Sequence, residues 1–268
     1  DVYKRQVVDR VIQQAIAQKL QSIWEPLFSD SSYGYRPKRS AQQAIQKVKE
    51  YVEEGYRYAV SVDLSKYFDT LNHELLMNLL HKQIQDMRVL RLVKKYLKSG
   101  VMENGVICKT EEGSPQGGPL SPLLANIYLN EFDWKMHSRG VKTVRYADDI
   151  VVFAKSKRAA ERLLESSRKY LEGKLKLKMN TEKSKVTSIF AVKEFKFLGF
   201  CIGKNGSGIY IRAHRKSLNK AKEKLKLLTK RNRGRNVRRV MAEGKSVYPW
   251  MAWLLPCSRD EADDEVLG

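Results

Sequence analysis

Hydrophobic and polar residues alternate along the chain with two different periods, and the helical period dominates. Apolar positions at helical spacing predict a helix over Val7–Trp24, and a second helix is expected over Ala41–Glu54 after a loop from Phe28 to Pro37. Further helices are expected over the following ranges: Glu74–His81, Met87–Lys98, Leu123–His137 and Ala159–Leu171.

Short runs of β-forming residues lie between these helices. They occupy Tyr58–Val62 and both sides of Tyr146–Asp149, and later runs occupy Ser184–Phe190, Glu194–Ile202 and Gly208–Ile211. Val101–Thr110 predicts a hairpin, because its centre is the turn dipeptide Asn104-Gly105. The order strand, helix, paired strands, helix, strand predicts an α+β fold with an antiparallel sheet backed by helices.

Three aspartates in these runs indicate metal chemistry. Asp148 and Asp149 are adjacent between two β-forming runs, and neighbours on a strand point to opposite faces. Both can serve one metal cluster only where the backbone turns sharply, as at a hairpin tip. Asp63, which ends the run from Tyr58, supplies the third carboxylate that two Mg²⁺ ions about 3.5–4 Å apart require.

Each of these acids also has a simpler interpretation. Asp148-Asp149 alone could be an exposed turn, and Asp63 alone could be an acid at the entry to a helix. Asp69, six residues further along, fits a cap of the following helix, which begins near Asn72, better than it fits a metal ligand.

The charge of the chain favours a polyanionic partner. Its 268 residues include 51 Lys and Arg against 30 Asp and Glu, a formal net charge of +21 that suits a phosphate backbone, although part of the excess could serve solubility. From Arg212 to Arg239 there are thirteen basic residues and one acid, Glu223. Leu218, Leu225 and Leu228 lie in this stretch at the spacing of one helix face, which predicts a docked helix with a basic outer surface.

Several other classes of protein are disfavoured. Cys108, Cys201 and Cys257 are far apart, and four histidines fit no metal-ligand spacing, so neither a zinc site nor a disulfide framework is indicated. No apolar run approaches the about 20 residues of a membrane span, and no signal peptide is recognisable. We expect no membrane partner and a cytoplasmic location.

Six segments, in order, resemble the motifs of group II intron-encoded reverse transcriptases. The six segments are Tyr33–Pro37, Val62–Asp69, Gly113–Pro122, Tyr146–Asp149, Asn180–Lys185 and Phe197–Phe200. The resemblance as a whole covers roughly residues 7 to 230. The resemblance implies a right-hand polymerase with an antiparallel palm sheet. It assigns 1–57 to partial fingers and upper palm, 58–211 to the palm, 212–247 to a basic helical thumb and 248–268 to a truncated or irregular tail.

The same resemblance assigns the metal site. Asp63 and Asp148 would be bridging ligands of two Mg²⁺ ions, or of Mn²⁺ in their place. Asp149 would complete the cluster less directly, and the backbone carbonyl of Leu64 would be a further ligand.

Substrate contacts also follow from the resemblance. Phe68 would be a steric gate against the ribose 2′-hydroxyl, with core packing as the alternative. Gln116 would bind the incoming deoxynucleotide, and Lys183 would contact nucleotide phosphates or the primer end. Nucleic-acid contacts are expected from the following basic residues: Arg36 on the template, and Lys220, Lys224 and Arg231 of the thumb on the template–primer duplex.

The resemblance therefore implies an RNA-directed DNA polymerase that extends a DNA primer on an RNA template, and a maturase that binds its own intron RNA in splicing and mobility. The alternative is a catalytically inactive maturase-type RNA-binding fragment, because residues 1–6 and 258–268 depart from the family pattern and the preceding fingers segments are absent. A metal-dependent nuclease is disfavoured, since it has no evident use for Phe68 or Gly113–Pro122. The sequence does not indicate an oligomeric state.

Overall fold

The computed structural model describes residues 7–98, 101–103, 106–108, 112–114, 118–191, 195–206 and 208–230. The chain divides into two compact units. One comprises residues 1–44 and 58–186, and the other comprises residues 45–57 and 187–268. These boundaries differ from those that the sequence suggested at 57, 211 and 247, which remain a prediction.

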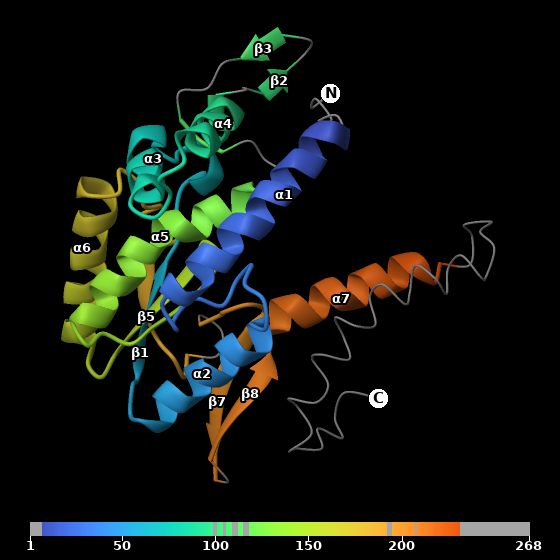
Figure 1. Cartoon of the computed structure of the whole chain (residues 1–268). Coiled ribbons are helices and arrows are strands. Elements are labelled where there is room, and N and C mark those ends of the chain that lie inside the picture. The colour runs from blue at the N-terminus through green and yellow to red at the C-terminus, as the bar shows by residue number, and fades with distance from the viewer. Residues whose placement is uncertain are drawn as a thin grey trace. The chain divides into compact units, whose positions relative to one another are not determined.

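Helices form most of the first unit (Figure 1). They are α1 (Val7–Trp24), α3 (His73–His81), α4 (Met87–Lys98), α5 (Ser121–Ser138) and α6 (Lys157–Gly173), with the short 3-10 helices η1 (Glu25–Leu27) and η2 (Tyr67–Asp69). All five predicted helices of this part are present with closely similar bounds. The helical period of the sequence therefore located them correctly.

The central sheet of four strands has the order β4-β5-β1-β6. Its strands are β1 (Tyr58–Val62), β4 (Thr143–Tyr146), β5 (Asp149–Ala154) and β6 (Lys185–Ser188). β5 pairs antiparallel with both β4 and β1, and the register places Val62 opposite Ile150 and Tyr146 opposite Asp149. A separate antiparallel hairpin, β2 (Val101–Glu103) and β3 (Val106–Cys108), confirms the predicted hairpin, although its Asn104-Gly105 turn lies outside the described residues.

The core of the first unit forms on one face of this sheet. Alternate strand residues, Val60 with Val62 and Ile150 with Val152, join one cluster of buried side chains with α1, α3, α4, α5 and α6. α6 packs on β1 and β5, while α5 contacts β4, α3 and α1. Figure 1 shows α5 crossing over the strands. The predicted α+β architecture is confirmed, and the central sheet is held against a helical layer.

The second unit contains part of α2 (Ala41–Glu53), which starts in the first unit, and the hairpin of β7 (Phe200–Asn205) and β8 (Gly208–Ala213). The expected strand over Glu194–Ile202 is wrong in its first half. Phe197 and Phe200 exchange both backbone hydrogen bonds, at 2.9 Å each, around Leu198 and Gly199, which both have positive φ. Two such residues form a primed tight turn, so Phe197–Phe200 reverses the chain before β7 begins.

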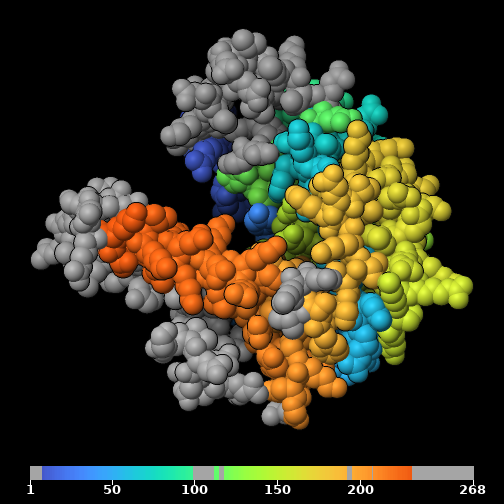
Figure 2. Space-filling model, turned by 180° about the vertical axis from the view of Figure 1, so that it is seen from behind, coloured from blue at the N-terminus to red at the C-terminus, as the bar shows by residue number. Residues whose placement is uncertain are grey.

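α7 (Arg215–Leu228) carries the predicted basic surface, although its apolar face differs from the prediction. Ser217 and Ala221 are buried, Leu225 and Leu228 are half-buried, and Leu218 is 40% exposed. At 100° per residue, Leu218 lies roughly 60° from Ala221 around the helix axis, at the margin of the packed stripe. The side chains of α7 are exposed along much of its length in Figure 2.

Among the helices of the described residues, we find none that combines the length and the apolar character needed to cross a membrane.

Candidate active site

Asp148 lies in a tight hairpin loop at one end of the central sheet. β4 ends at Tyr146 and β5 begins at its partner Asp149, so Ala147 and Asp148 form a two-residue loop. Ala147 has a φ of 58°, which primed hairpin loops require at their first position. The predicted sharp turn is therefore present. Asp148 is half-buried and Asp149 is exposed.

Asp63 reaches the same end of the sheet from the neighbouring strand. It follows Val62, the last residue of β1, and Val62 is paired with Ile150, the residue after Asp149. The antiparallel register thus brings the aspartate that ends β1 beside the β4–β5 loop, although 85 positions of sequence separate Asp63 from Asp148. Asp63 is half-buried, which leaves part of its carboxylate accessible.

The segment 178–184 holds the backbone of Asp63 on both sides. Asn180 donates its backbone N–H to the carbonyl of Asp63 (2.9 Å), and Asp63 donates its own N–H to Ser184 Oγ (3.0 Å). Ser65 donates to the carbonyl of Lys178 (2.9 Å). The Asn180–Lys185 motif therefore supports Asp63, a role that sequence alone did not reveal.

Lys183 belongs to the same segment and faces the aspartate. Its Nζ lies 4.0 Å from Asp63 Oδ1, and its backbone N–H donates to Asn180 Oδ1 (3.2 Å). The side chain is 68% exposed. An exposed ammonium beside the predicted metal ligand can also reach a phosphate, so the structure is compatible with the expected nucleotide contact.

The donor set fits Mg²⁺ only in part. Among the described residues, no three His, Cys, Asp or Glu side chains form a group that could hold a metal ion, and the roles of Asp63, Asp148 and Asp149 as metal ligands stay predictions. Asp63 and Asp148 nevertheless supply accessible carboxylate oxygens at one end of the sheet. Such a pair fits, because Mg²⁺ is commonly held by one or two carboxylates together with waters and substrate phosphates.

The carbonyl of Leu64 is compatible with its predicted role as a ligand. Leu64 forms an isolated antiparallel bridge with Met179, and the hydrogen bonds of this bridge come from Asp63 and Ser65 rather than from Leu64 itself. Its side chain is buried in the core. The bridge therefore does not use the Leu64 carbonyl.

Phe68 lies on η2 at the border of the core. It is partly buried, packs against the core cluster, and its ring centroid lies 5.3 Å from that of Tyr67. Its carbonyl accepts a hydrogen bond from the N–H of Ser114 (2.5 Å). A half-buried ring is consistent with the gate and with packing, so both interpretations remain.

The loop that begins at Gly113 is anchored to this region. Gly113 donates its N–H to the carbonyl of Leu71 (2.8 Å), and the carbonyl of Gly113 accepts from Nε2 of His73 (2.5 Å). Gly113 has a φ of 91° and lies against the backbone of Asp69, where no side chain would fit. Gln116 lies outside the described residues, so its contact with the nucleotide remains a prediction.

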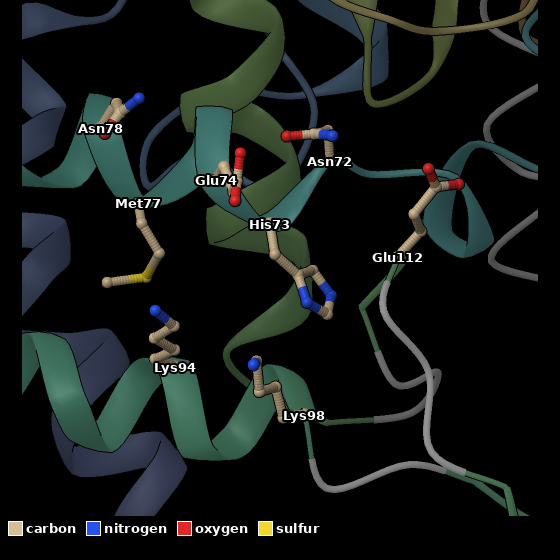
Figure 3. Close-up of a pocket in the computed structure, with 8 residues that line it drawn as sticks. All are labelled: Asn72, His73, Glu74, Met77, Asn78, Lys94, Lys98 and Glu112. Atoms are coloured by element: carbon tan, nitrogen blue, oxygen red, sulfur yellow. The ribbon is translucent and has the colours of Figure 1, made fainter.

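A pocket of about 680 Å³ lies beside this anchor, lined by side chains of α3 and α4, with Asn72 and Glu112. Figure 3 shows the imidazole of His73 pointing from α3 toward Lys98. None of the predicted site residues lines this pocket. It is therefore separate from the candidate active site.

The prediction for Asp69 is wrong. The N-cap of α3 is Asn72, whose Oδ1 accepts a hydrogen bond from the N–H of Leu75 (2.9 Å). Asp69 instead ends the 3-10 helix η2, and its N–H donates to the carbonyl of Lys66 (2.8 Å). The extra turn of η2 places Asp69 too early in the chain to cap α3.

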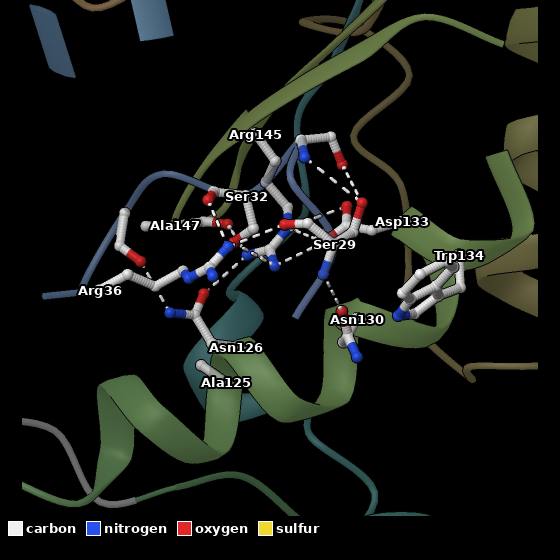
Figure 4. A network of polar contacts seen from close by, with 12 residues as sticks. Ser29, Ser32, Arg36, Ala125, Asn126, Asn130, Asp133, Trp134, Arg145 and Ala147 are labelled. Carbon is white, nitrogen blue, oxygen red and sulfur yellow. Dashed lines mark hydrogen bonds and ion pairs between the residues drawn. The ribbon is translucent and has the colours of Figure 1, made fainter. Parts of the chain in front are cut away.

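Arg36 is also placed differently from the expectation. Its side chain is 5% exposed and pairs with Glu25 (2.8 Å), and its guanidinium donates to the carbonyls of Ser29 and Ser32 (2.8 and 2.9 Å). Figure 4 shows it turned into this loop. The template contact predicted for Arg36 is therefore corrected to a structural role, because its guanidinium binds the protein itself.

A second buried arginine, Arg145, immediately precedes Tyr146-Ala147-Asp148-Asp149. Its guanidinium makes three hydrogen bonds to Asp133, of 3.1, 2.8 and 2.6 Å, and both side chains are fully buried. It also binds Asn126 and Ala147 (Figure 4). Sequence analysis missed these residues. The available signal was the position of Arg145 in a β-forming run, which made a charged side chain there unusual.

Tyr35 is a further residue that the sequence did not single out. It has a φ of 55° and is 52% exposed. Partial burial and the nearby charge of Asp148 raise the pKa of its hydroxyl above the ordinary value. Tyr35 thus places a partly accessible phenol close to Asp148 of the β4–β5 hairpin.

The predicted nucleic-acid contacts on α7 lie in the second unit. Lys220 and Lys224 are exposed, as are Arg215, Lys216, Lys222 and Lys226. Arg231 lies outside the described residues. The described part of the basic stretch therefore presents a row of cations to solvent.

Comparison with known proteins gives a consistent result. Residues 3–202 match the family described as reverse transcriptase (RNA-dependent DNA polymerase). The chain is 36% identical over 219 residues to protein YkfC of Escherichia coli (strain K12), covering 68% of this chain and 58% of that protein. It is 31% identical over 264 residues to the group II intron-encoded protein LtrA of Lactococcus lactis subsp. cremoris, covering 75% of this chain and 44% of that protein. The chain thus spans about half the length of these relatives.

The fold is shared with solved telomerase structures. Telomerase from Candida albicans, solved with a fragment of telomeric RNA, has a TM-score of 0.57 at 16% identity and covers 93% of this chain and 48% of that one. This likeness confirms the predicted right-hand polymerase fold. The chain belongs to the reverse transcriptase family, and its similarity to LtrA places it with the group II intron-encoded members of that family.

Proposed function

We propose that the chain carries the catalytic core of an RNA-directed DNA polymerase, which adds deoxynucleotides to the 3′-hydroxyl of a DNA primer on an RNA template. The observation that carries this proposal is the meeting of Asp63 and the Ala147-Asp148 loop at one end of the central sheet. Asn180 and Ser184 hold the backbone of Asp63, which fixes the point from which its carboxylate extends.

Asp63 and Asp148 would hold two Mg²⁺ ions, with the Leu64 carbonyl and Asp149 as further ligands. Bound Mg²⁺ stabilises the charge on the transferring phosphoryl group and on the attacking and leaving oxygens. The protein positions these ligands through strand register and through the backbone hydrogen bonds of Asp63. Mn²⁺ has similar oxygen preferences and would be accepted in the same place.

Other side chains would select and orient the nucleotide. The exposed Lys183 would neutralise phosphate charge beside Asp63. The ring of Phe68, held at the border of the core, would exclude a ribose 2′-hydroxyl and so favour deoxynucleotides. Gln116 would add a hydrogen bond from the loop whose start is anchored to Leu71 and His73.

We also propose that the basic surface of α7 contacts nucleic acid, with Lys220, Lys224 and Arg231 on the template–primer duplex or on intron RNA. The exposed cations of α7 support this role, and the similarity to LtrA suggests intron RNA as a partner in splicing and mobility. A chain that only bound intron RNA would need this surface and would not need Asp63 or Asp148.

Primer extension tests the polymerase. The protein is given a DNA primer on an RNA template with Mg²⁺ and four deoxynucleotides, beside Asp148→Asn and the control Asp30→Asn. Asp30 is an exposed acid whose side chain pairs with Arg39. We expect Asp148→Asn to reduce extension by about 1,000-fold or more, because charge stabilisation by the metal ions amounts to several kcal/mol and each 1.36 kcal/mol corresponds to tenfold in rate.

The control should extend the primer normally. Equal extension by Asp148→Asn and the parent protein would contradict the proposed site. Absence of extension by every protein, together with salt-sensitive RNA binding, would favour the inactive maturase-type fragment.

A further inference from the structure

A buried ion pair between Arg145 and Asp133 lies beside the Tyr146–Asp149 hairpin. Arg145 and Asp133 are both fully buried, and the guanidinium uses all of its N–H groups. Nε and one terminal nitrogen bind Asp133, and that nitrogen also donates to Ser32 Oγ (2.8 Å). The other terminal nitrogen, Nη1, donates to Asn126 Oδ1 (2.7 Å) and to the carbonyl of Ala147 (2.9 Å).

The hydrogen bond from Arg145 to the carbonyl of Ala147 is made at a residue with an unfavourable backbone conformation. Ala147 has a side chain and yet adopts a left-handed φ of 58°. Residues with a Cβ avoid this region because the Cβ crowds the following carbonyl, so the conformation persists only where its surroundings hold it. Arg145 supplies such a hold, since it bonds the carbonyl that leads into Asp148.

Asn126 adds a second hold, because it links Arg145 to Gly34. Its Nδ2 donates to the carbonyl of Gly34 (2.7 Å), while its Oδ1 accepts from Arg145. Gly34 lies against the hairpin so closely that a Cβ would overlap the N–H of Ala147 and meet the carbonyl carbon of Tyr146 at 2.9 Å. The loop that contains Gly34 thus packs closely against the hairpin, and Asn126 and Arg145 join the two (Figure 4).

We propose that Arg145, Asp133 and Asn126 are positioning residues that set the place of Asp148 through the backbone of Ala147. The proposal rests on the proposed function, because it concerns the same metal site. Asp133 neutralises the buried charge of Arg145 and orients its guanidinium, and Arg145 and Asn126 fix the loop. None of the three touches a substrate or a metal ion.

The chain provides a matched control for a purely structural role. Asn130 lies one turn along α5 from Asn126, is also buried, and also makes two hydrogen bonds, from its Nδ2 to the carbonyl of Leu27 and to its Oδ1 from the N–H of Ser29 (3.0 Å each). Its partners are Leu27 and Ser29, and neither belongs to the Tyr146–Asp149 hairpin. Asn126→Ala and Asn130→Ala therefore remove similar interactions from the same helix, and only the first touches the hairpin.

The experiment compares these two variants of the full chain in three measurements. Thermal unfolding reports stability, the electron paramagnetic resonance signal of free Mn²⁺ reports metal binding without any reaction, and primer extension reports the Mg²⁺ concentration for half-maximal rate. We expect similar losses of stability. We expect Asn126→Ala alone to weaken Mn²⁺ binding and to raise the Mg²⁺ requirement about tenfold, within the roughly 100-fold effect of a 1 Å misplacement.

Arg145→Lys is the second variant. Lysine keeps a positive charge beside Asp133 but cannot bind Asp133, Asn126 and Ala147 together, because it lacks the planar fork of arginine. A folded Arg145→Lys protein should share the metal defect of Asn126→Ala. If Arg145→Lys does not fold, the two asparagine variants decide.

Equal metal behaviour of Asn126→Ala and Asn130→Ala would overturn the proposal, whatever their stability. The result is separable from the proposed function. Mn²⁺ binding that weakens only in Asn126→Ala, in a protein that extends no primer, would support the positioning role and contradict the polymerase. Normal primer extension by the parent protein, with equal Mn²⁺ binding and Mg²⁺ requirement in Asn126→Ala and Asn130→Ala, would support the polymerase and contradict the positioning role.

Discussion

Two arginines, Arg36 and Arg145, are buried and bind groups of the protein itself. Arg36 binds Glu25 and two carbonyls of its own loop, and Arg145 binds Asp133 and the hairpin carbonyl of Ala147. Arg36 lies within a motif and Arg145 immediately precedes one, in a strongly basic chain in which a contact with nucleic acid is the first expectation for an arginine. Burial cannot be inferred from the residue type, so only the structure assigns these side chains to structural roles.

Phe68 permits a prediction at the residue scale. Phe68→Val should increase incorporation of ribonucleotides relative to deoxynucleotides, because a smaller side chain leaves room for the 2′-hydroxyl. Competition between the two nucleotide types in primer extension measures this ratio. A lower melting temperature with an unchanged ratio would show that the half-buried ring serves only in packing.

Gly34 gives a second prediction. Gly34→Ala should destabilise the protein by about 1–3 kcal/mol and reduce extension, because the new Cβ would overlap the backbone of Ala147. Gly173→Ala is the control, since no atom lies within 4 Å of the Cβ that it would introduce in α6. Urea denaturation of both variants checks the difference, and equal stabilities would contradict the close packing of Gly34.

At the scale of elements, caps and turns account for most departures from the sequence prediction. η2 adds a turn after Asp63, so that α3 is capped by Asn72 and not by Asp69. The turn at Phe197–Phe200 likewise shortens an expected strand, because Leu198 and Gly199 both take positive φ. Such local geometry depends on which backbone groups find partners, and hydrophobic periodicity does not report it.

The cap of α3 can be tested directly. Asn72→Ala should cost about 1 kcal/mol of unfolding free energy, because the N–H of Leu75 loses its acceptor. Asn78→Ala on the same helix lacks this role and should change stability less. Chemical denaturation of the two proteins measures both values, and a larger loss in Asn78→Ala would contradict the assignment of the cap.

The basic surface of α7 predicts a salt effect. Lys220→Ala combined with Lys224→Ala should weaken binding to an RNA–DNA duplex and lower the slope of log affinity against log salt by roughly 2, as expected when two phosphate contacts are lost. Lys157 and Lys169, exposed on α6, provide the control double variant. Fluorescence anisotropy over a salt series measures the slopes, and equal slopes for both double variants would argue against α7 as the binding surface.

At the scale of the whole molecule, catalysis and nucleic-acid binding are assigned to different units. Asp63 and Asp148 lie in the first unit, whereas α7 lies in the second. The two activities should therefore respond differently to the same treatment.

Removal of divalent metal is that treatment. Addition of EDTA should abolish primer extension and leave duplex binding through α7 nearly unchanged, because binding there depends on lysine and arginine charges. Restored Mg²⁺, or Mn²⁺, should restore extension. Gel analysis measures extension, and fluorescence anisotropy on the same samples measures duplex binding. Extension that persists in EDTA would contradict the proposed role of the aspartates.

The sequence by itself determined the α-helices, most of the strands, the order of motifs and the family. Val7–Trp24 and Met87–Lys98 have the predicted bounds, and Asp148 lies in the predicted hairpin loop. These features depend on local periodicity and on turn chemistry, both of which are written in short stretches of sequence.

Only the tertiary structure decided which side chains support the site. Ser184 holds Asp63 across 121 positions of sequence, and Asn126, which also binds Arg145, binds Gly34 across 92. It also showed that no three carboxylates form a metal-holding group among the described residues, although strand register brings Asp63 beside the hairpin. Hydrogen bonds and burial depend on residues that meet only after folding, and for that reason local sequence patterns do not contain them.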